Sequence, residues 1–190
     1  GLVYLTVMVN PLSGFVTAIS VGSYLFLYTP LKQKTPLCLL IGAVPGALPP
    51  VTGWVAATGS VSVEAGVLFA ILFLWQVPHS LAIAVLYRDD YARADIKLLP
   101  VVDPDGRSTG RQIVSNCLAL FAVALLPTTL GLAGTFYFMA ALVLGLAFLL
   151  CGIMLAASRT HGAARRLLWA SLLYLPVLLS LMAWDKVRFQ

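Results

Sequence analysis

The chain has 190 residues, of which 61% are hydrophobic and only 10% are charged, and its mean hydropathy is +0.96. Soluble domains contain about 25% charged residues, so this composition excludes a soluble globular protein and indicates a polytopic membrane protein. The net charge of +5 could suggest nucleic-acid binding, but the cations stand in loops between apolar stretches, where membrane topology accounts for them. We therefore expect the lipid bilayer, and no nucleic acid, among the partners.

Apolar stretches recur along the whole chain. A membrane-spanning helix needs about 20 apolar residues, and we expect six complete spans, over residues 11–27, 37–57, 65–86, 111–132, 135–157 and 167–184. Residues 1–9 are too short to span alone. Because Asn10-Pro11 is a turn-initiating pair, we interpret them as the tail of an earlier span. The prediction is a single all-α membrane domain, a transmembrane helix bundle over residues 1–190.

The second span contains the unusual segment IGAVPGALPPVTGW at residues 41–54. Prolines remove helix hydrogen bonds, so Pro45, Pro49 and Pro50 predict a bent or discontinuous helix. Irregular backbone at membrane depth is tolerated only where protein or a cavity covers it. A kinked structural helix with closely packed glycines explains the same residues equally well.

The third span runs directly into the charged segment YRDDYARADIK. If the helix continues to residue 94 at about 100° per residue, the polar residues Gln76 and His79 share one stripe with Tyr87 and Asp90. Polar groups inside a membrane normally face the bundle interior or a wet cavity. We therefore expect this stripe to line a site, with His79 roughly 16 Å from Asp90 along the helix.

Carboxylates and cations gather where this span leaves the membrane: Arg88, Asp89, Asp90, Arg93, Asp95 and Lys97. Two interpretations remain open. One is a solvated cluster whose cations follow the positive-inside rule. The other is a magnesium diphosphate site, in which carboxylates hold a hydrated Mg²⁺ that bridges to phosphate oxygens. Lys32 and Lys34, in the neighbouring loop YTPLKQKTP, would add positive charge to the same phosphates.

Later segments carry weaker signals. VDPDGRSTG, with Asp103 and Asp105, predicts a turn before the next helix, and His161 in the basic loop SRTHGAARR is expected to face solvent. The cysteines lie inside apolar stretches and are interpreted as packing residues: Cys38, Cys117 and Cys151. Aromatic and basic residues near the C-terminal end are expected to anchor the membrane interface: Tyr174, Trp184, Lys186 and Arg188.

The cations are divided unequally between the two sides of the membrane. With alternate loops on alternate sides, one side carries Lys32, Lys34, Arg88, Arg93, Lys97, Arg107, Arg111, Arg159, Arg165 and Arg166. The other side carries only Lys186 and Arg188. Because cytoplasmic loops hold the excess of Lys and Arg, we expect the rich side, with the charged helix end, to be cytoplasmic.

Four segments, YTPLKQKTP, IGAVPGALPPVTGW, FLWQVPHSLAIA and YRDDYARADIKLLPVV, together resemble the protoheme IX farnesyltransferases, the haem O synthase (heme O synthase) branch of the UbiA-type intramembrane prenyltransferases. W-Q-x-P-H and Y-R-x-D-Y are specific to this branch, and the resemblance runs through the whole chain. It implies a nine-helix bundle around a central cavity, of which this chain is the C-terminal part. The first aspartate-rich motif of the family has no match here, so we expect the chain to hold only half of the metal site.

The resemblance also implies roles for the residues at the charged helix end. Asp90 matches the aspartate of Y-R-x-D-Y and is expected to bind Mg²⁺, with Asp89 and Asp95 as weaker candidates. Lys32 matches a diphosphate-contacting lysine, and Lys34 is its companion. Further expected roles are stabilisation of the leaving group by Arg88 and Arg93, and lining of the substrate pocket by Gln76, Tyr87 and Tyr91. His79 is expected to contact haem, as an axial ligand; a packed, hydrogen-bonded histidine is the alternative.

The implied reaction transfers the farnesyl group of farnesyl diphosphate to a vinyl side chain of protoheme IX. Water adds at the same time, and the products are haem O, for haem-copper terminal oxidase biogenesis, and diphosphate. The expected location is the bacterial inner membrane, and oxidase assembly factors are candidate partners. The alternatives are a related prenyltransferase with an aromatic or chlorophyll-like acceptor and a non-catalytic haem-handling membrane protein. A transporter is disfavoured because the charge is concentrated on one side.

Overall fold

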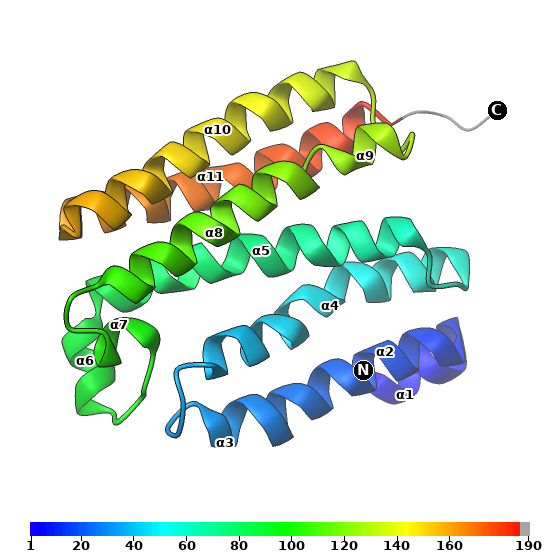
Figure 1. The fold of residues 1–190 in the computed structure, drawn as a ribbon. Coiled ribbons are helices and arrows are strands. Elements are labelled where there is room, and N and C mark those ends of the chain that lie inside the picture. Colours follow the sequence, from blue (N-terminus) through cyan, green and yellow to red (C-terminus); the bar gives the residue numbers. More distant parts are fainter. Residues whose placement is uncertain (187–190) are drawn as a thin grey trace.

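The computed structural model describes residues 1–186, and almost all of them are helical (Figure 1). Six helices are long and apolar enough to cross a membrane: Pro11–Leu31, Cys38–Thr58, Val63–Leu86, Arg107–Thr129, Thr135–Ser158 and His161–Trp184. Within the described residues, β-pairing is limited to one isolated bridge between Ala133 and Lys186. The predicted all-α helix bundle with six spans is confirmed.

The chain breaks at Asn10, as the Asn-Pro pair predicts. Two short helical segments precede Asn10: α1 (Leu2–Tyr4) and a π-helical turn (Leu5–Val9). The first span follows and consists of α2 (Pro11–Gly22), a second π-helical segment (Ser23–Tyr28) and α3 (Thr29–Leu31). Asn10 is extended (φ −161°), and its side chain accepts a hydrogen bond from the Ser13 amide. This cap satisfies one of the free N–H groups at the start of α2.

Helix α4 (Cys38–Thr58) contains all three prolines of the second span and is nevertheless continuous. Pro49 has no N–H to offer the Pro45 carbonyl, and the Ser20 hydroxyl donates to that oxygen instead, at 3.0 Å. The glycines of α4 admit neighbours closely: a Cβ on Gly42 would lie 2.6 Å from the Tyr28 ring. Of the two interpretations left open by the sequence, the structural helix with closely packed glycines agrees with α4, and the helix is not discontinuous.

Helix α5 (Val63–Leu86) lies at the centre of the bundle, in contact with α4, α8 (Arg107–Val123) and α11 (His161–Trp184). The short helix α9 (Leu126–Thr129) completes the fourth span, and α10 (Thr135–Ser158) packs on both α8 and α11. The main core lies between these helices. Its largest fully buried side chains include Tyr137, Phe148, Ile71 and Leu81.

The start of α11 and the aromatic residues near its end differ from the predictions. Residues 161–166 are not a loop, because α11 begins at His161, where the Thr160 side chain caps the Ala163 amide. Tyr174 is not an interface anchor, since it is buried and its ring stacks on Phe148 with centroids 5.1 Å apart. Trp184 is 72% exposed, as an anchor requires; Arg188 lies outside the described residues. The cysteines are free, and all are buried or half-buried.

The outer surface of the bundle is strongly apolar. Phe26, Phe136 and Val143 are each at least 66% exposed. In water, such a large exposed apolar surface would cost free energy. Lipid removes that penalty because acyl chains are as apolar as these side chains. The six apolar spans and this surface identify an integral membrane protein.

Most cations lie together at one end of the bundle. This end contains α3, the short helices α6 (Arg88–Arg93) and α7 (Leu99–Val102), the start of α8 and the connection from α10 to α11 (Figure 1). The opposite end contains the turn between α4 and α5 and the helix α9. The predicted separation of charge along the bundle axis is therefore present in the fold.

Candidate functional site at the charged end of helix 5

Helix α5 does not continue into the charged segment. It ends at Leu86, Tyr87 leaves helical geometry (φ −113°, ψ 31°), and α6 begins as a separate helix at Arg88. The prediction of one continuous helix to residue 94 is therefore wrong. After this break, Tyr91 and Ile96 pack on a small core around Cys38, Ala84 and Leu98.

The two loops that were predicted to share a phosphate lie side by side. The Lys97 amide donates to the Lys32 carbonyl at 3.1 Å, so the segment after α6 is joined to the segment after α3. Lys32 is half-buried and Lys34 is exposed. The fold therefore brings a lysine loop next to the aspartate-containing segment, through a backbone contact between residues far apart in sequence.

The aspartates of this segment are open to solvent. Asp89, Asp90 and Asp95 are all exposed, and Asp90 forms an ion pair with Arg93 on the same helix. Asp95 has a left-handed backbone (φ 52°), which ends α6. Within residues 1–186, no three His, Cys, Asp or Glu side chains gather closely enough to hold a metal ion. A metal that retains most of its waters needs only one or two carboxylates besides phosphate oxygens, and exposed Asp89 and Asp90 fit that requirement.

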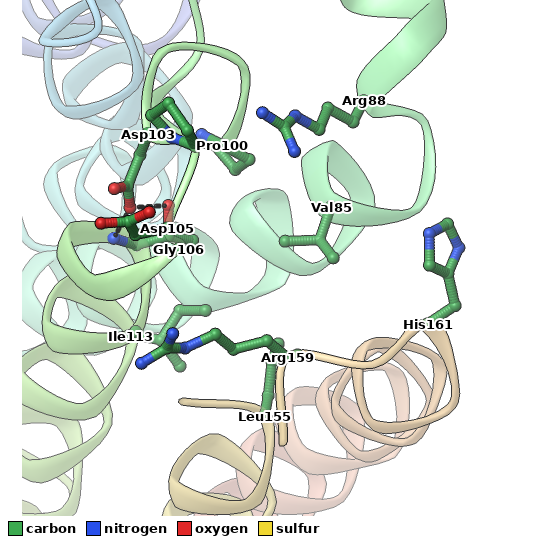
Figure 2. A pocket seen from close by; sticks show the side chains of 13 residues that line it. Val85, Arg88, Pro100, Asp103, Asp105, Gly106, Ile113, Leu155, Arg159 and His161 are labelled. Carbon is green, nitrogen blue, oxygen red and sulfur yellow. Dashed lines mark hydrogen bonds between the residues drawn. The ribbon is translucent and has the colours of Figure 1, made fainter. Parts of the chain in front are cut away.

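Arg88 lines a pocket of about 160 Å³, which does not include the aspartates of the charged segment (Figure 2). The pocket also contains Asp103, Asp105, Arg159 and His161, which come from the turn before α8 and from the connection between α10 and α11. Sequence reasoning did not bring Arg159 and His161 to this place, because their proximity to Arg88 depends on how the spans pack. The exposed position of His161 agrees with the prediction.

Asp103 organises the turn on one side of this pocket. Its carboxylate accepts hydrogen bonds from the Thr109 amide at 2.7 Å and the Thr109 hydroxyl at 2.9 Å. Burial would raise the pKa of Asp103, but these hydrogen bonds and the charge of Arg111 lower it below its usual value. The predicted turn before a helix is confirmed, and the Asp103 carboxylate holds this turn through Thr109.

Gln76 lies deeper in the bundle and faces α4. Its side-chain amide donates to the Ala43 carbonyl at 2.6 Å, and it lines a cavity of about 170 Å³ together with Tyr24, Tyr28 and Ser80. A Cβ on Gly46 would lie 2.3 Å from the Gln76 Oε1 atom, so this contact depends on the glycine. Gln76 therefore connects α5 and α4 at the rim of a small polar cavity.

His79 faces a different neighbour, helix α11. Its Nδ1 atom lies 2.7 Å from the Ser171 hydroxyl, and its ring stacks on Trp75 with centroids 4.9 Å apart. Trp75 in turn donates its indole N–H to the Ser171 carbonyl at 2.9 Å. The predicted stripe is thus divided, because Gln76 contacts α4 and His79 contacts α11. Sequence reasoning missed Trp75 and Ser171, although the spacing of Trp75 and His79 places them on one helix face.

The two tyrosines lie in the charged segment itself, Tyr87 at its start and Tyr91 within α6. Tyr87 is 54% exposed at the break between α5 and α6. Tyr91 is half-buried and packs on the small core that holds the charged segment in place. The region therefore combines a solvent-facing charged end with half-buried polar side chains inside the bundle, an arrangement that suits a ligand with a charged head and a large apolar body.

Comparison with known proteins places the chain in a family. Residues 1–181 match the family model described as the UbiA prenyltransferase family. Protoheme IX farnesyltransferase of Solibacter usitatus is 52% identical over 98% of this chain and 64% of its own length. Protoheme IX farnesyltransferase of Koribacter versatilis is 48% identical over 96% of this chain and 61% of its own length. The chain thus spans about three fifths of these relatives' length, and no solved structure matches it. The protein belongs to the UbiA prenyltransferase family.

Proposed function

We propose that the full-length protein transfers the farnesyl group of farnesyl diphosphate to a vinyl side chain of protoheme IX, with addition of water, and releases haem O and diphosphate. The observation that carries this proposal is the 52% identity, over 98% of the chain, to a protein named protoheme IX farnesyltransferase. The charged end and the half-buried polar residues of α5 support it, because the two substrates need a site for diphosphate and a site for a large apolar ring.

The diphosphate is proposed to bind at the end of α5. Asp90 and, more weakly, Asp89 and Asp95 are the proposed metal-binding carboxylates. Lys32 and Lys34 come from the loop whose backbone is hydrogen-bonded to Lys97, and they are the proposed contacts of the diphosphate from that loop. Arg88 and Arg93 are the further cations proposed to stabilise the departing diphosphate, by electrostatic attraction to its growing charge.

Mg²⁺ is the proposed metal. The carboxylates suit a hard cation that retains most of its waters and is held by one or two carboxylates and the phosphates. When bound, such a metal neutralises charge that develops on the leaving diphosphate. Arg93 pairs with Oδ1 of Asp90, which leaves Oδ2 for a metal and keeps a guanidinium beside the proposed phosphate site.

Protoheme IX is proposed to bind deeper, beside His79, Gln76, Tyr87 and Tyr91. When the carbon–oxygen bond of farnesyl diphosphate breaks, the electron pair leaves with diphosphate and an allylic cation remains. The vinyl π electrons form the new carbon–carbon bond, and water adds to the resulting cation and loses a proton. The residues of the chain bind, orient and exclude bulk water, and no protein nucleophile is needed.

The proposed setting is the bacterial inner membrane, with the diphosphate site on the cytoplasmic face. The concentration of Lys and Arg at the α6 end supports this orientation, because cytoplasmic loops carry the excess of these residues. Haem O is required by haem-copper terminal oxidases, so oxidase assembly factors are the proposed protein partners.

The test is an assay of the full-length protein in membranes with protohaem, farnesyl diphosphate and Mg²⁺, followed by mass analysis of extracted haem. We expect a hydroxyethylfarnesyl mass gain with the unmodified protein and a loss of more than 100-fold with Asp90→Ala, since removal of one strong electrostatic contact costs about that much. The control is Glu64→Ala, which removes a carboxylate in the first turn of α5, at the opposite end of the bundle. Unmodified haem together with prenylation of another acceptor would refute the haem assignment.

A further inference from the structure

Ser171 has one hydroxyl proton and two hydrogen-bond neighbours, the Leu168 carbonyl and the His79 ring. The Ser171 Oγ donates to the Leu168 carbonyl at 2.6 Å, within α11. The same oxygen lies 2.7 Å from the His79 Nδ1 atom. Since the single proton is used in the bond to Leu168, the oxygen must accept a hydrogen bond from Nδ1. This assignment makes the contact between α5 and α11 an Nδ1–H···Oγ hydrogen bond.

We infer that Ser171 and Trp75 are positioning residues that hold His79 in the Nδ1-protonated tautomer, with the Nε2 lone pair free for a ligand. A neutral imidazole carries one N–H, so a proton on Nδ1 leaves Nε2 as an acceptor. Nε2 has no hydrogen-bond partner within residues 1–186. The His79 side chain is half-buried, and Nε2 is the ring nitrogen that this tautomer leaves without a proton.

Trp75 fixes both partners of this hydrogen bond. Its indole ring stacks on the His79 imidazole with planes 17° apart, which restricts rotation of the imidazole. Its N–H donates to the carbonyl of Ser171, which restricts the position of α11 relative to α5. Ser171 is fully buried, so water does not compete for its hydroxyl. Three contacts therefore set the orientation and the tautomer of one half-buried imidazole.

This arrangement has the chemistry of a metal-ligating histidine. Such a histidine donates its second ring N–H to an oxygen acceptor, which fixes the tautomer and directs the other nitrogen at the metal. The inference about the tautomer does not depend on the substrate. Its consequence, that Nε2 is directed at the iron of a bound porphyrin, rests on the proposed function.

The tautomer can be measured by nitrogen-15 NMR of the full-length protein in lipid bilayers, with labelled histidine. The chain contains two histidines, His79 and His161, and the His79 signals are those lost in His79→Gln and retained in His161→Gln. We expect Nδ1 to be protonated and Nε2 to show the downfield shift of a bare nitrogen. Ser171→Ala is expected to give a mixture of tautomers, and Ser171→Thr, which keeps the hydroxyl, is expected to restore the single form.

A bare Nδ1 with a protonated Nε2 in the unmodified protein would overturn the inference, whether or not any variant folds. An unchanged tautomer in Ser171→Ala would overturn the role of Ser171. Binding of protohaem, followed by its Soret absorption, supplies a separate readout: Ser171→Ala should weaken binding by roughly 10- to 100-fold, the usual effect of removing such a partner. If the tautomer is as inferred and no variant or unmodified protein binds protohaem, the proposed function fails and the tautomer assignment stands.

Discussion

At the scale of single residues, Gly46 shows how a missing side chain positions a polar one. Gln76 reaches the Ala43 carbonyl by passing over Gly46, where a Cβ would lie 2.3 Å from the Gln76 Oε1 atom. We expect Gly46→Ala to displace Gln76 and to destabilise the protein by roughly 1–3 kcal/mol, the usual range for overpacking. The measurement is thermal unfolding of the full-length protein in detergent.

Gly53 provides the control, because it lies in the same helix and a Cβ there would meet nothing within 4 Å. Gly53→Ala should be neutral or stabilising by up to about 1 kcal/mol, since alanine loses less backbone entropy on folding. Equal effects of the two substitutions would show that helix propensity, rather than the Gln76 contact, decides the result.

The lowered pKa of Asp103 predicts that the free energy of unfolding depends on pH. Its folded pKa is lowered: burial opposes ionisation, but the Thr109 hydrogen bonds and Arg111 outweigh burial. The stabilisation is therefore present above the unfolded pKa of about 3.9 and is lost as the pH falls through the lower folded value. At neutral pH, Asp103→Ala should cost about 1 kcal/mol, as loss of a helix cap does.

The check is to compare melting temperatures of the unmodified protein and Asp103→Ala at pH 7 and near pH 3, where the difference should shrink. Asp105→Ala serves as a control, because Asp105 has no hydrogen bond that holds the turn within the described residues. A difference that grows on acidification would contradict the stabilising role of the Asp103 carboxylate.

Some contacts of the site could be predicted from the sequence, and others could not. The spacing of Trp75 and His79 places both on one face of a helix, so the stacking of their rings could be predicted from the sequence. Ser171 lies 92 residues after His79, and no local pattern connects them. The same holds for Arg159 and His161, which reach the pocket of Arg88 only through packing of separate spans.

At the scale of elements, apolar length predicted all six spans, because the thickness of the bilayer sets the length of a spanning helix. The break between α5 and α6 was not predictable in the same way. No proline or glycine marks it, and Tyr87 to Arg93 are compatible with a helix. The break exists because Leu98, Tyr91 and Ile96 pack against α4 and α5, a tertiary effect that overrides local preference.

That explanation predicts the effect of Leu98→Ala. Leu98 is buried in the small core with Cys38 and Ala84, and its removal should cost about 2 kcal/mol or more, as for other buried leucines. Because the core is confined to this end, the loss should appear mainly as faster hydrogen exchange of residues 87–102. Val102→Ala, at a residue that is 45% exposed, should leave exchange nearly unchanged.

If Leu98→Ala accelerated exchange equally throughout the bundle, the charged segment would not be a separate unit held by this core. If exchange stayed unchanged, the local helix preference of residues 88–93 would suffice to hold it. The expected result, with faster exchange limited to residues 87–102, would connect the small core directly to the position of Asp90.

At the scale of the whole molecule, the distribution of charge predicts the orientation in the membrane. The turn between α4 and α5 and the turn before α8 lie at opposite ends of the bundle (Figure 1). Ser60 and Asp105 are exposed at these two turns. If the cation-rich end is cytoplasmic, a membrane-impermeant maleimide added to intact cells should label Ser60→Cys and should label Asp105→Cys only after the cells are permeabilised.

The native cysteines limit the background of this experiment, because Cys38 and Cys117 are buried and Cys151 is half-buried. The protein without an introduced cysteine gives the blank for each condition. The reverse labelling pattern would place α6 outside the cell and would separate the proposed diphosphate site from a substrate supplied by the cytoplasm. Labelling of Ser60→Cys from outside supports the proposed site on physical grounds, since a diphosphate cannot cross the apolar layer unaided and must meet Asp90 on the side where it is made.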